Sequence, residues 1–389
     1  MTVVCVGIGA DGWDGLTPVA QQAFREAEVL FGMQRQLDLV PLDVEKVRWG
    51  TPLVPSIESL LSAHEGRRRV VVASGDPLFY GIGSTLRRLV GDVRVVPHLS
   101  SLSLACAREG WSQQDVTVVS LVGRPLALLT AALHDGALVL VLSADASTPA
   151  AVARSLATHG FGASELAVWS QLGGPAESCR RDIASSWSGP VDPLNVIALT
   201  CRGTGLAVVP GLPDDAFDND GQITKREVRA VVLALLAPQP GQLLWDVGAG
   251  TGSVGIEWAR SGGATIAVEK DPAKCARVAR NASALGVPEL AVVEGPAPAA
   301  LLALASPDAV FVGGGATAPG VLEHCWGALA SGGRLVVNAV TVESEAVLLD
   351  WQAKQGGELL RLSVQRTAPV GSFTGWKPAT SLTIWSVTR

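Results

Sequence analysis

An apolar run that ends in an acid and three spaced glycines is the stretch of this sequence best suited to holding a nucleotide. In "DVGAGTG", Asp246 closes the run, and Gly248, Gly250 and Gly252 follow at alternate positions. Glycine lets the backbone approach a ligand closely, and a helix that begins at such a turn offers unpaired N–H groups. Glu269 ends the next apolar run, 17 residues after Gly252. Doubly wound folds place an acid on ribose hydroxyls at about this distance.

Three interpretations of this glycine turn are open. It could be a tight strand-to-helix turn without a ligand, or a dinucleotide turn, although G-x-G-x-x-G would need its third glycine one residue later. The spacing D-x-G-x-G-x-G with a later acid resembles the Rossmann-like S-adenosylmethionine (SAM) methyltransferases, and we favour this third interpretation. By that resemblance the cofactor-binding residues are Asp246, Gly248, Ala249, Gly250, Thr251, Gly252 and Glu269.

Further segments narrow the resemblance to the decarboxylating precorrin methyltransferase domains of cobalamin biosynthesis. They are "DNDGQITKREVRA", "GPAPAAL", "VFVGGG" and "GGRLVVNAVT", spread with the glycine turn over about 180 residues. The resemblance implies that Thr224 contacts SAM and that Ala297 lies near the adenine. Pro296 stands where this family usually has an acid, so a contact from Ala297 would come from the backbone.

Decarboxylation of an acetate side chain is more demanding for the second domain than methyl transfer, because an acid must protonate the carbon that loses CO2. The candidates are Lys225, Glu227 and Asn338, with His324 as a further one. Lys225 and Arg226 could equally anchor ring carboxylates. Glu227 could be an exposed helix residue and His324 a packing residue. Trp376, expected in a glycine-rich loop before the last strand, is a candidate for stacking on a flat macrocycle.

A second glycine-rich turn opens the chain but does not have dinucleotide spacing. In "GIGADGWDGLTPVA", Gly7 and Gly9 follow an apolar run, and a helix start appears only at Thr17 and Pro18. Two later segments accompany this turn. "ASGDPLFYGIG" places Asp76 before a rigid proline at a strand end, and "PHLSSLSLACAREG" places two serines at the start of a helix. Such hydroxyls cap a helix or meet a ligand.

This ordered set resembles the tetrapyrrole methylase family over about 200 residues. The family fold consists of two small α/β subdomains with SAM folded into the cleft between them. The resemblance implies that Gly7 and Gly9 let the substrate or cofactor approach, and that Gly75, Asp76 and Pro77 shape the SAM pocket beside Ser100 and Ser101. His98 replaces a more usual glycine. It either packs in the protein or contacts a substrate carboxylate.

Alternating apolar runs and alanine-rich helical stretches must position these residues. The alternation predicts an α/β protein, with a two-subdomain tetrapyrrole methylase fold followed by a Rossmann-like SAM methyltransferase fold. Proline, aspartate, asparagine and glycine cluster in "AVVPGLPDDAFDNDGQ" and mark a boundary. We expect a first domain at 1–206, with subdomains of about 1–110 and 111–206, a linker at 207–221 and a second domain at 222–389.

Composition restricts the partners and the compartment. Hydrophobic residues make up 48% of the 389 residues, yet no run reaches the roughly 18 apolar residues of a membrane-spanning helix. The net charge of -6 disfavours nucleic acid. The six cysteines form no CxxC pair, so we expect no disulfide framework and no metal site. An N-terminus without a basic segment predicts a cytoplasmic protein. We also expect a homo-oligomer.

The two resemblances together imply a bifunctional enzyme that uses two SAM molecules. The first domain would methylate carbon 5 of precorrin-6B, and the second would remove CO2 from the ring C acetate and methylate carbon 15, giving precorrin-8X. Three alternatives remain. The substrate could be the cobalt-bearing precorrin or another small molecule, the chain could be an RNA methyltransferase fusion, or the first domain could only sense SAM. Few basic clusters argue against RNA.

Overall fold

The chain divides into two compact units. The structure, a computed structural model, describes residues 2–207 and 210–389. Unit 1 comprises Met1–Leu126 and Ala132–Gly205, and unit 2 comprises Leu206–Arg389 with Ala127–Ala131. Part of the segment expected as a linker packs onto unit 2, because Leu212 and Phe217 are buried with Ile256 there.

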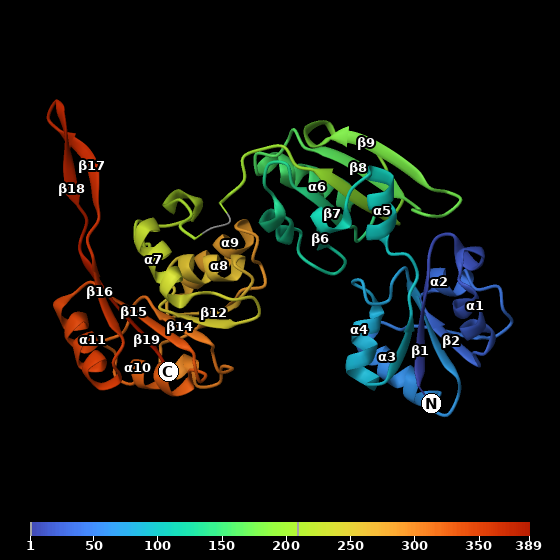
Figure 1. Cartoon of the computed structure of the whole chain (residues 1–389), viewed down its shortest axis with the longest axis horizontal. Helices are drawn as coiled ribbons and strands as arrows, with labels where there is room; N and C mark the ends of the chain where they lie inside the picture. The colour runs from blue at the N-terminus through green and yellow to red at the C-terminus, as the bar shows by residue number, and fades with distance from the viewer. Residues whose placement is uncertain (1, 208–209) are drawn as a thin grey trace. The chain divides into compact units, whose positions relative to one another are not determined.

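The first subdomain of unit 1 is a parallel sheet of order β3-β2-β4-β1-β5, which is blue to cyan in Figure 1. Both faces are covered, as parallel sheets require. Along β1, Val6 and Ile8 pack with side chains of α1 and α2, whereas Val3 and Cys5 pack with those of α3 and α4. The elements are β1 (Val3–Ile8), α1 (Pro18–Arg25), β2 (Val29–Gly32), α2 (Gln34–Asp38), β3 (Glu45–Arg48), α3 (Leu53–Ala63), β4 (Arg69–Ser74), α4 (Ile82–Val90) and β5 (Val93–Val96).

The second subdomain is a mixed sheet of order β6-β7-β10-β8-β9. The pair β6 and β7 is parallel, whereas β10 runs antiparallel to β7 and β8, and β9 antiparallel to β8. Ala105 of α5 packs against this sheet with Leu140 and Ala198. The elements are α5 (Ser101–Glu109), β6 (Val116–Ser120), β7 (Leu138–Leu142), α6 (Thr148–Thr158), β8 (Glu165–Ser170), β9 (Ser178–Ile183) and β10 (Asn195–Thr200).

The sequence pattern does not predict three strands of unit 1. The helix predicted to start at Thr17 and Pro18 ends at Arg25, and β2 follows it. The four buried residues of β2 are too few for periodicity to separate a strand from a helix. The other two, β3 and β9, are mostly exposed edge strands of polar sequence. Edge strands do not show the continuous apolar run that marks a buried parallel strand.

Unit 2 is a doubly wound sheet of order β13-β12-β11-β14-β15-β19-β16. Trp245 and Val247 of β11 pack with α10 and α11, and Leu244 packs on the other face with α7 and α8. The strand order reverses between β11 and β14, and ligands of such sheets bind at that switch point. The elements are α7 (Arg226–Leu236), β11 (Leu243–Val247), α8 (Ser253–Arg260), β12 (Ala264–Glu269), α9 (Pro272–Ala284), β13 (Ala291–Glu294), β14 (Ala309–Val312), α10 (Val321–Ala328), β15 (Arg334–Ala339), α11 (Val342–Gln355), β16 (Glu358–Leu362) and β19 (Leu382–Thr388).

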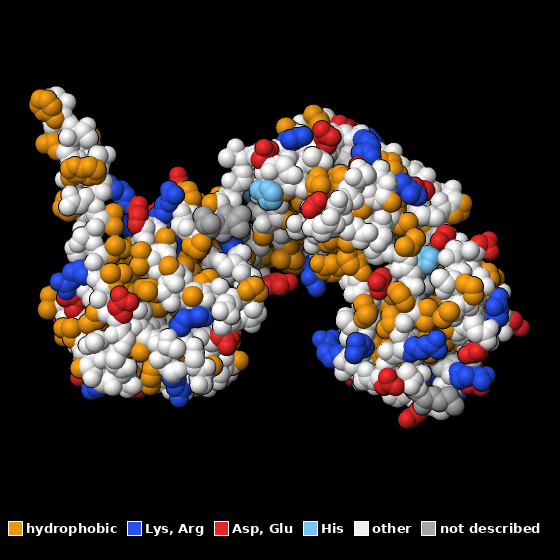
Figure 2. Space-filling view, viewed as in Figure 1, with side chains coloured by type: hydrophobic (Ala, Val, Ile, Leu, Met, Phe, Trp, Pro, Cys, Tyr) orange, Lys and Arg blue, Asp and Glu red, His pale blue; other side chains and the backbone are white. Residues whose placement is uncertain are grey.

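A separate hairpin of β17 (Gln365–Val370) and β18 (Phe373–Pro378) precedes the last strand. The expectation that Trp376 lies in a loop is therefore wrong, because Trp376 pairs with Thr367 in this hairpin. Glycines at 371 and 375 suggested a loop, but Gly371 forms the turn of a hairpin. Val370, Phe373 and Trp376 are exposed, and Figure 2 shows apolar side chains along the projecting hairpin.

The predicted fold class is confirmed in both units. Each apolar run that the sequence analysis placed before a candidate site residue forms a strand. Within the described residues, every helix is too short or too polar to cross a bilayer. Basic and acidic side chains are interspersed on the face shown in Figure 2.

Candidate active sites

A cavity of about 970 Å³ lies at the carboxyl ends of β11, β12, β14 and β15 in unit 2. This is the switch point at which a doubly wound sheet binds ligands. Its wall brings together most of the residues predicted from the sequence, although they come from distant segments. They are Thr224, Lys225, Asp246, Gly248, Ala249, Gly250, Thr251, Glu269, Ala297 and Asn338.

The three glycines of the turn have different structural roles. All have positive φ, of 71° at Gly248, 60° at Gly250 and 74° at Gly252. A Cβ atom on Gly248 would lie 2.8 Å from the Gly314 carbonyl oxygen, so this glycine permits close packing of two loops. Gly252 is the N-cap of α8. A Cβ atom on Gly250 would meet nothing within 4 Å, so the turn is open to a ligand there.

The Glu269 carboxylate holds the glycine turn to the next strand. Its Oε2 accepts a hydrogen bond from the Gly250 N–H at 3.0 Å. Its Oε1 accepts from the N–H groups of Lys270 at 2.9 Å and Asp271 at 3.1 Å. Each carboxylate oxygen has two acceptor sites, so the group retains capacity for a hydroxyl in the cavity.

Asp246 is a fully buried acid beneath the turn. Burial raises the pKa of its carboxyl to about 7, and the charge of Glu269 adds to this rise. The hydrogen bond that Oδ2 accepts from the Gly255 N–H, at 2.9 Å, acts in the opposite direction. Asp246 therefore carries a proton for a large fraction of the time near neutral pH.

Polar and cationic side chains also line the cavity. Asn338 is 8% exposed, and its Oδ1 has no hydrogen-bond partner among the described residues. The Lys225 ammonium donates to the Gly221 carbonyl at 3.3 Å and lies 3.8 Å from Asp214 Oδ2. Lys270 and Lys274 also line the cavity. Sequence reasoning missed these two lysines, although their positions directly after Glu269 and early in α9 were a usable signal.

Five sequence candidates lie outside the wall of this cavity. One is Gly252, the N-cap of α8. Arg226 is also not among the residues that line the cavity. Glu227 forms an ion pair with Arg366 of β17. Burial acts to raise the pKa of Glu227, but its backbone hydrogen bond and Arg366 hold that pKa below its ordinary value, which is unsuitable for a proton donor. His324 stacks on Trp245, with ring centroids 6.0 Å apart. Trp376 is 71% exposed on the hairpin.

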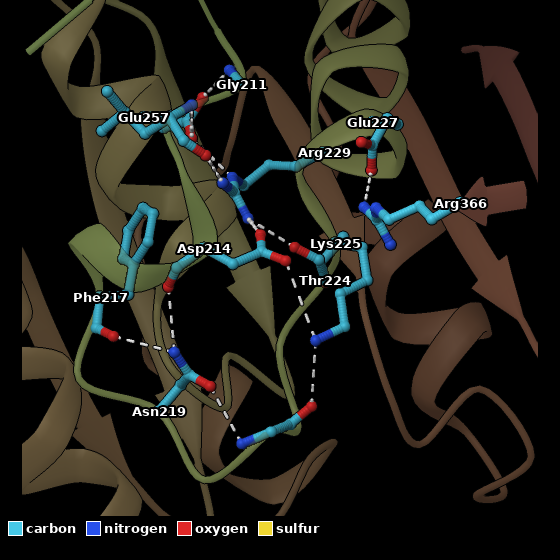
Figure 3. A network of polar contacts seen from close by, with 12 residues as sticks. Gly211, Asp214, Phe217, Asn219, Thr224, Lys225, Glu227, Arg229, Glu257 and Arg366 are labelled. Carbon is cyan, nitrogen blue, oxygen red and sulfur yellow. Dashed lines mark hydrogen bonds and ion pairs between the residues drawn. The ribbon is translucent and has the colours of Figure 1, made fainter. Parts of the chain in front are cut away.

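A buried arginine network that the sequence analysis did not identify supports the cavity (Figure 3). Arg229 is fully buried, and its Nε lies 2.5 Å from Glu257 Oε1. Its Nη1 donates to the carbonyl of Thr224, which lines the cavity, at 2.5 Å.

The same pair holds the segment before α7. Glu257 accepts hydrogen bonds from the N–H groups of Gly211 and Leu212, and Phe217 lies 4.8 Å below the guanidinium. Residue 229 shares one helix face with the buried Val232, Leu233 and Leu236. A polar residue at a core position of the helical period was the available signal.

Unit 1 encloses a separate cavity of about 450 Å³. Its lining includes residues of both sheets, such as Ile8 of β1 and Leu142 of β7, which is the cleft position expected from the family resemblance. Five of the predicted residues line it: Gly9, Gly75, Asp76, Ser100 and Ser101. Sequence reasoning missed Arg35, Trp49, Trp169 and Asn195, which also line it.

The serine pair and the Asp76 turn form as predicted. Ser100 is the N-cap of α5, and its hydroxyl oxygen accepts a hydrogen bond from the Ser103 N–H at 3.2 Å. The Asp76 carboxylate accepts from the Leu78 N–H at 2.8 Å. Gly75 has a φ of 55°, which lets the chain turn sharply at the end of β4.

Gly7, Pro77 and His98 are not among the residues that line this cavity. A Cβ atom on Gly7 would lie 2.0 Å from the Gly75 carbonyl oxygen, so Gly7 permits contact between two loops. The Pro77 carbonyl accepts from the Gly83 N–H at 2.8 Å. His98 Nε2 lies 3.2 Å from Asp11 Oδ1, and its side chain is 6% exposed. This packing matches the first of the two interpretations given for His98.

Two family models match the chain in consecutive segments. The model described as tetrapyrrole (corrin/porphyrin) methylases matches residues 2–184, and the precorrin methyltransferase domain matches residues 215–389. The second segment contains all residues that line the unit 2 cavity, and the first contains most of those that line the unit 1 cavity.

Three curated relatives span all or part of the chain. A precorrin-6Y C(5,15)-methyltransferase (decarboxylating) of a Sinorhizobium species is 47% identical over 99% of this chain and 95% of its own. A probable cobalt-precorrin-6B C(15)-methyltransferase (decarboxylating) of Saccharolobus solfataricus is 32% identical over 35% of this chain and 73% of its own. A cobalt-precorrin-7 C(5)-methyltransferase of Salmonella typhimurium is 33% identical over 40% of this chain and 78% of its own. With one relative matched over nearly its full length, the chain belongs to the family of decarboxylating precorrin-6Y C(5,15)-methyltransferases.

Proposed function

We propose that the two units divide the reaction on precorrin-6Y, and that each binds its own SAM. Unit 1 methylates carbon 5, and unit 2 removes CO2 from an acetate side chain and methylates carbon 15. The observation that carries this proposal is that each unit encloses its own cavity, of about 450 Å³ in unit 1 and about 970 Å³ in unit 2. The existence of relatives named for one carbon each supports the division.

In unit 2 the residues present fit SAM. Gly250 leaves open space where a side chain would stand, and Glu269 has an acceptor site left for a ribose hydroxyl. Thr224 and the backbone of Ala297 line the same cavity and complete the proposed cofactor site. When bound, SAM supplies an electrophilic methyl group. The enzyme then has to align the acceptor carbon with it, and positioning alone lowers a barrier by roughly 7 to 11 kcal/mol.

In unit 1 we assign SAM to the cavity wall formed by Gly75, Asp76, Ser100 and Ser101. The sharp turn after β4 and the capped start of α5 place polar groups on an otherwise largely apolar wall, which includes Trp49. Gly7, Pro77 and His98 then act indirectly, by holding the loops that carry these residues.

Decarboxylation requires the carboxylate to leave as CO2 and the remaining electron pair to be protonated. An ion pair to the departing carboxylate would stabilise the ground state and oppose the step. We therefore assign Lys225, Lys270 and Lys274 to carboxylates that the product retains. Asn338, whose Oδ1 has no partner among the described residues, is the residue we assign to orienting the reacting acetate.

Calorimetry on the full chain tests the two-site proposal. S-adenosylhomocysteine is titrated into the wild type and into Ser101→Trp and Ala249→Trp, which place an indole in one cavity each. We expect two equivalents per wild-type chain and one per variant. A wild-type stoichiometry of one, or a variant that loses both sites while its circular dichroism is unchanged, would overturn the proposal.

We also propose that the protein is a homo-oligomer. Val370 and Phe373, which are 62% and 80% exposed, pair on one face of the hairpin, and exposed apolar patches mark interaction surfaces. Trp376, 71% exposed, lies three residues after Phe373 and so on the other face. Light scattering on the wild type tests the oligomer, and a monomer at micromolar concentration contradicts it.

A further inference from the structure

The unit 1 cavity contains a cation without a charge partner. Among the described residues that line it, Arg35 carries the one cationic side chain and Asp76 the one carboxylate. Arg35 forms no ion pair with a described residue, and its Nη2 donates instead to the Ser74 hydroxyl oxygen at 2.8 Å. A guanidinium has five N–H donors in a planar fork, so most of its donors remain available.

Arg35 is partly desolvated at the cavity wall. The side chain as a whole is exposed, but partial desolvation of the guanidinium lowers the pKa of Arg35 below its ordinary value. The neighbouring Gln36 amide donates from Nε2 to the same Ser74 oxygen at 2.8 Å, while its buried Oε1 has no partner among the described residues. Ser74 thus fixes two donor-bearing side chains at the end of β4, beside the Gly75 turn.

We propose that Arg35 binds a carboxylate in the unit 1 cavity. A partly desolvated guanidinium without a counter-ion is the group that proteins use for bidentate carboxylate recognition. The inference rests on the proposed function, in which this cavity receives both SAM and the tetrapyrrole. Both molecules carry carboxylates, and the arms of the experiment separate them.

The experiment uses the full chain with Arg35→Gln, Arg35→Lys and the control Arg88→Gln. Arg88 is an exposed arginine of α4 outside the cavity wall, so its variant makes the same change of charge. Calorimetry gives the Kd of S-adenosylhomocysteine at unit 1, and initial rates of carbon-5 methylation give KM for precorrin-6Y and kcat.

Arg35→Gln is expected to weaken one ligand about 10- to 100-fold, the range for a hydrogen bond between charged groups. A rise in KM alone assigns the carboxylate to the tetrapyrrole, and a rise in the Kd of S-adenosylhomocysteine assigns it to SAM. Arg35→Lys should recover part of the loss, since it keeps the charge without the planar fork.

An Arg35→Gln variant that matches Arg88→Gln in both constants would overturn the inference. Failure of the proposed function is distinguishable from this result, since the wild type would then produce no carbon-5 methylation at all.

Discussion

The backbone N–H of Gly250 donates a hydrogen bond to Oε2 of Glu269 at 3.0 Å. One carboxylate thereby fixes the glycine turn of unit 2 and keeps one acceptor site, on Oε2, for a ligand. The conformation of the turn and the affinity for the cofactor should consequently depend on the same side chain.

Glu269→Gln should weaken S-adenosylhomocysteine binding at unit 2 by about 10-fold or more, because a charge-assisted acceptor is lost. Calorimetry on the full chain measures this, with the unit 1 site as an internal reference. Glu294→Gln is the matched control, since Glu294 pairs with Glu269 in register on the neighbouring strand and is exposed. Equal binding by both variants would remove Glu269 from the cofactor site.

The raised pKa of Asp246 predicts a pH-dependent stability of unit 2 in the absence of ligand. A carboxyl with a folded pKa of about 7 binds more protons in the folded than in the unfolded state between about pH 4 and pH 7. The contribution of Asp246 to the free energy of unfolding should therefore fall as the pH rises through this window, by on the order of 4 kcal/mol in all, and level off above it.

Urea unfolding at several pH values measures this dependence, with hydrogen exchange of the β11 amides as the probe of unit 2. Asp246→Asn should lack this contribution, because the amide does not titrate, so the wild type should lose stability relative to Asp246→Asn as the pH rises through the window. An equal pH dependence of the two proteins would contradict the assignment of a protonated buried carboxyl.

The buried pair of Arg229 and Glu257 predicts a large cost of removing one partner. Glu257→Ala leaves the Arg229 Nε–H and the N–H groups of Gly211 and Leu212 without their acceptor. Such a loss destabilises a protein by about 3 to 5 kcal/mol. Urea unfolding of the full chain measures it. Lys354→Ala breaks an exposed pair with Asp350 and should change stability by less than about 1 kcal/mol.

The sequence predicted those site residues that lie directly after apolar strands. Asp246, Glu269 and Asn338 each lie at the carboxyl end of one of the parallel strands of a single sheet, so the topology alone brings them to one edge. The sequence did not predict Arg35 and Trp49 as site residues, because β2 and β3, which position them, are short or polar. Arg229 was not predicted because its partners lie on segments distant in sequence, and pairing of this kind depends on tertiary packing.

Asn338 should affect turnover in unit 2 without affecting cofactor binding. Asn338→Leu keeps the approximate volume but removes the unpartnered Oδ1, and the rate of CO2 release should fall about 10-fold or more. Rates of CO2 release and the Kd of S-adenosylhomocysteine are measured on the same preparation. An unchanged rate, or a loss of cofactor affinity equal to the loss of rate, would contradict an orienting role.

The central claim is that unit 1 and unit 2 perform separate steps with separate SAM molecules. Mass spectrometry of the product from precorrin-6Y and SAM tests it most directly, with the wild type, Ser101→Trp and Ala249→Trp side by side. The wild-type product should gain two methyl groups and lose one CO2. Ser101→Trp should give one methyl gain with loss of CO2, and Ala249→Trp one methyl gain without it. Loss of CO2 undiminished in Ala249→Trp, or abolished in Ser101→Trp, would contradict this division.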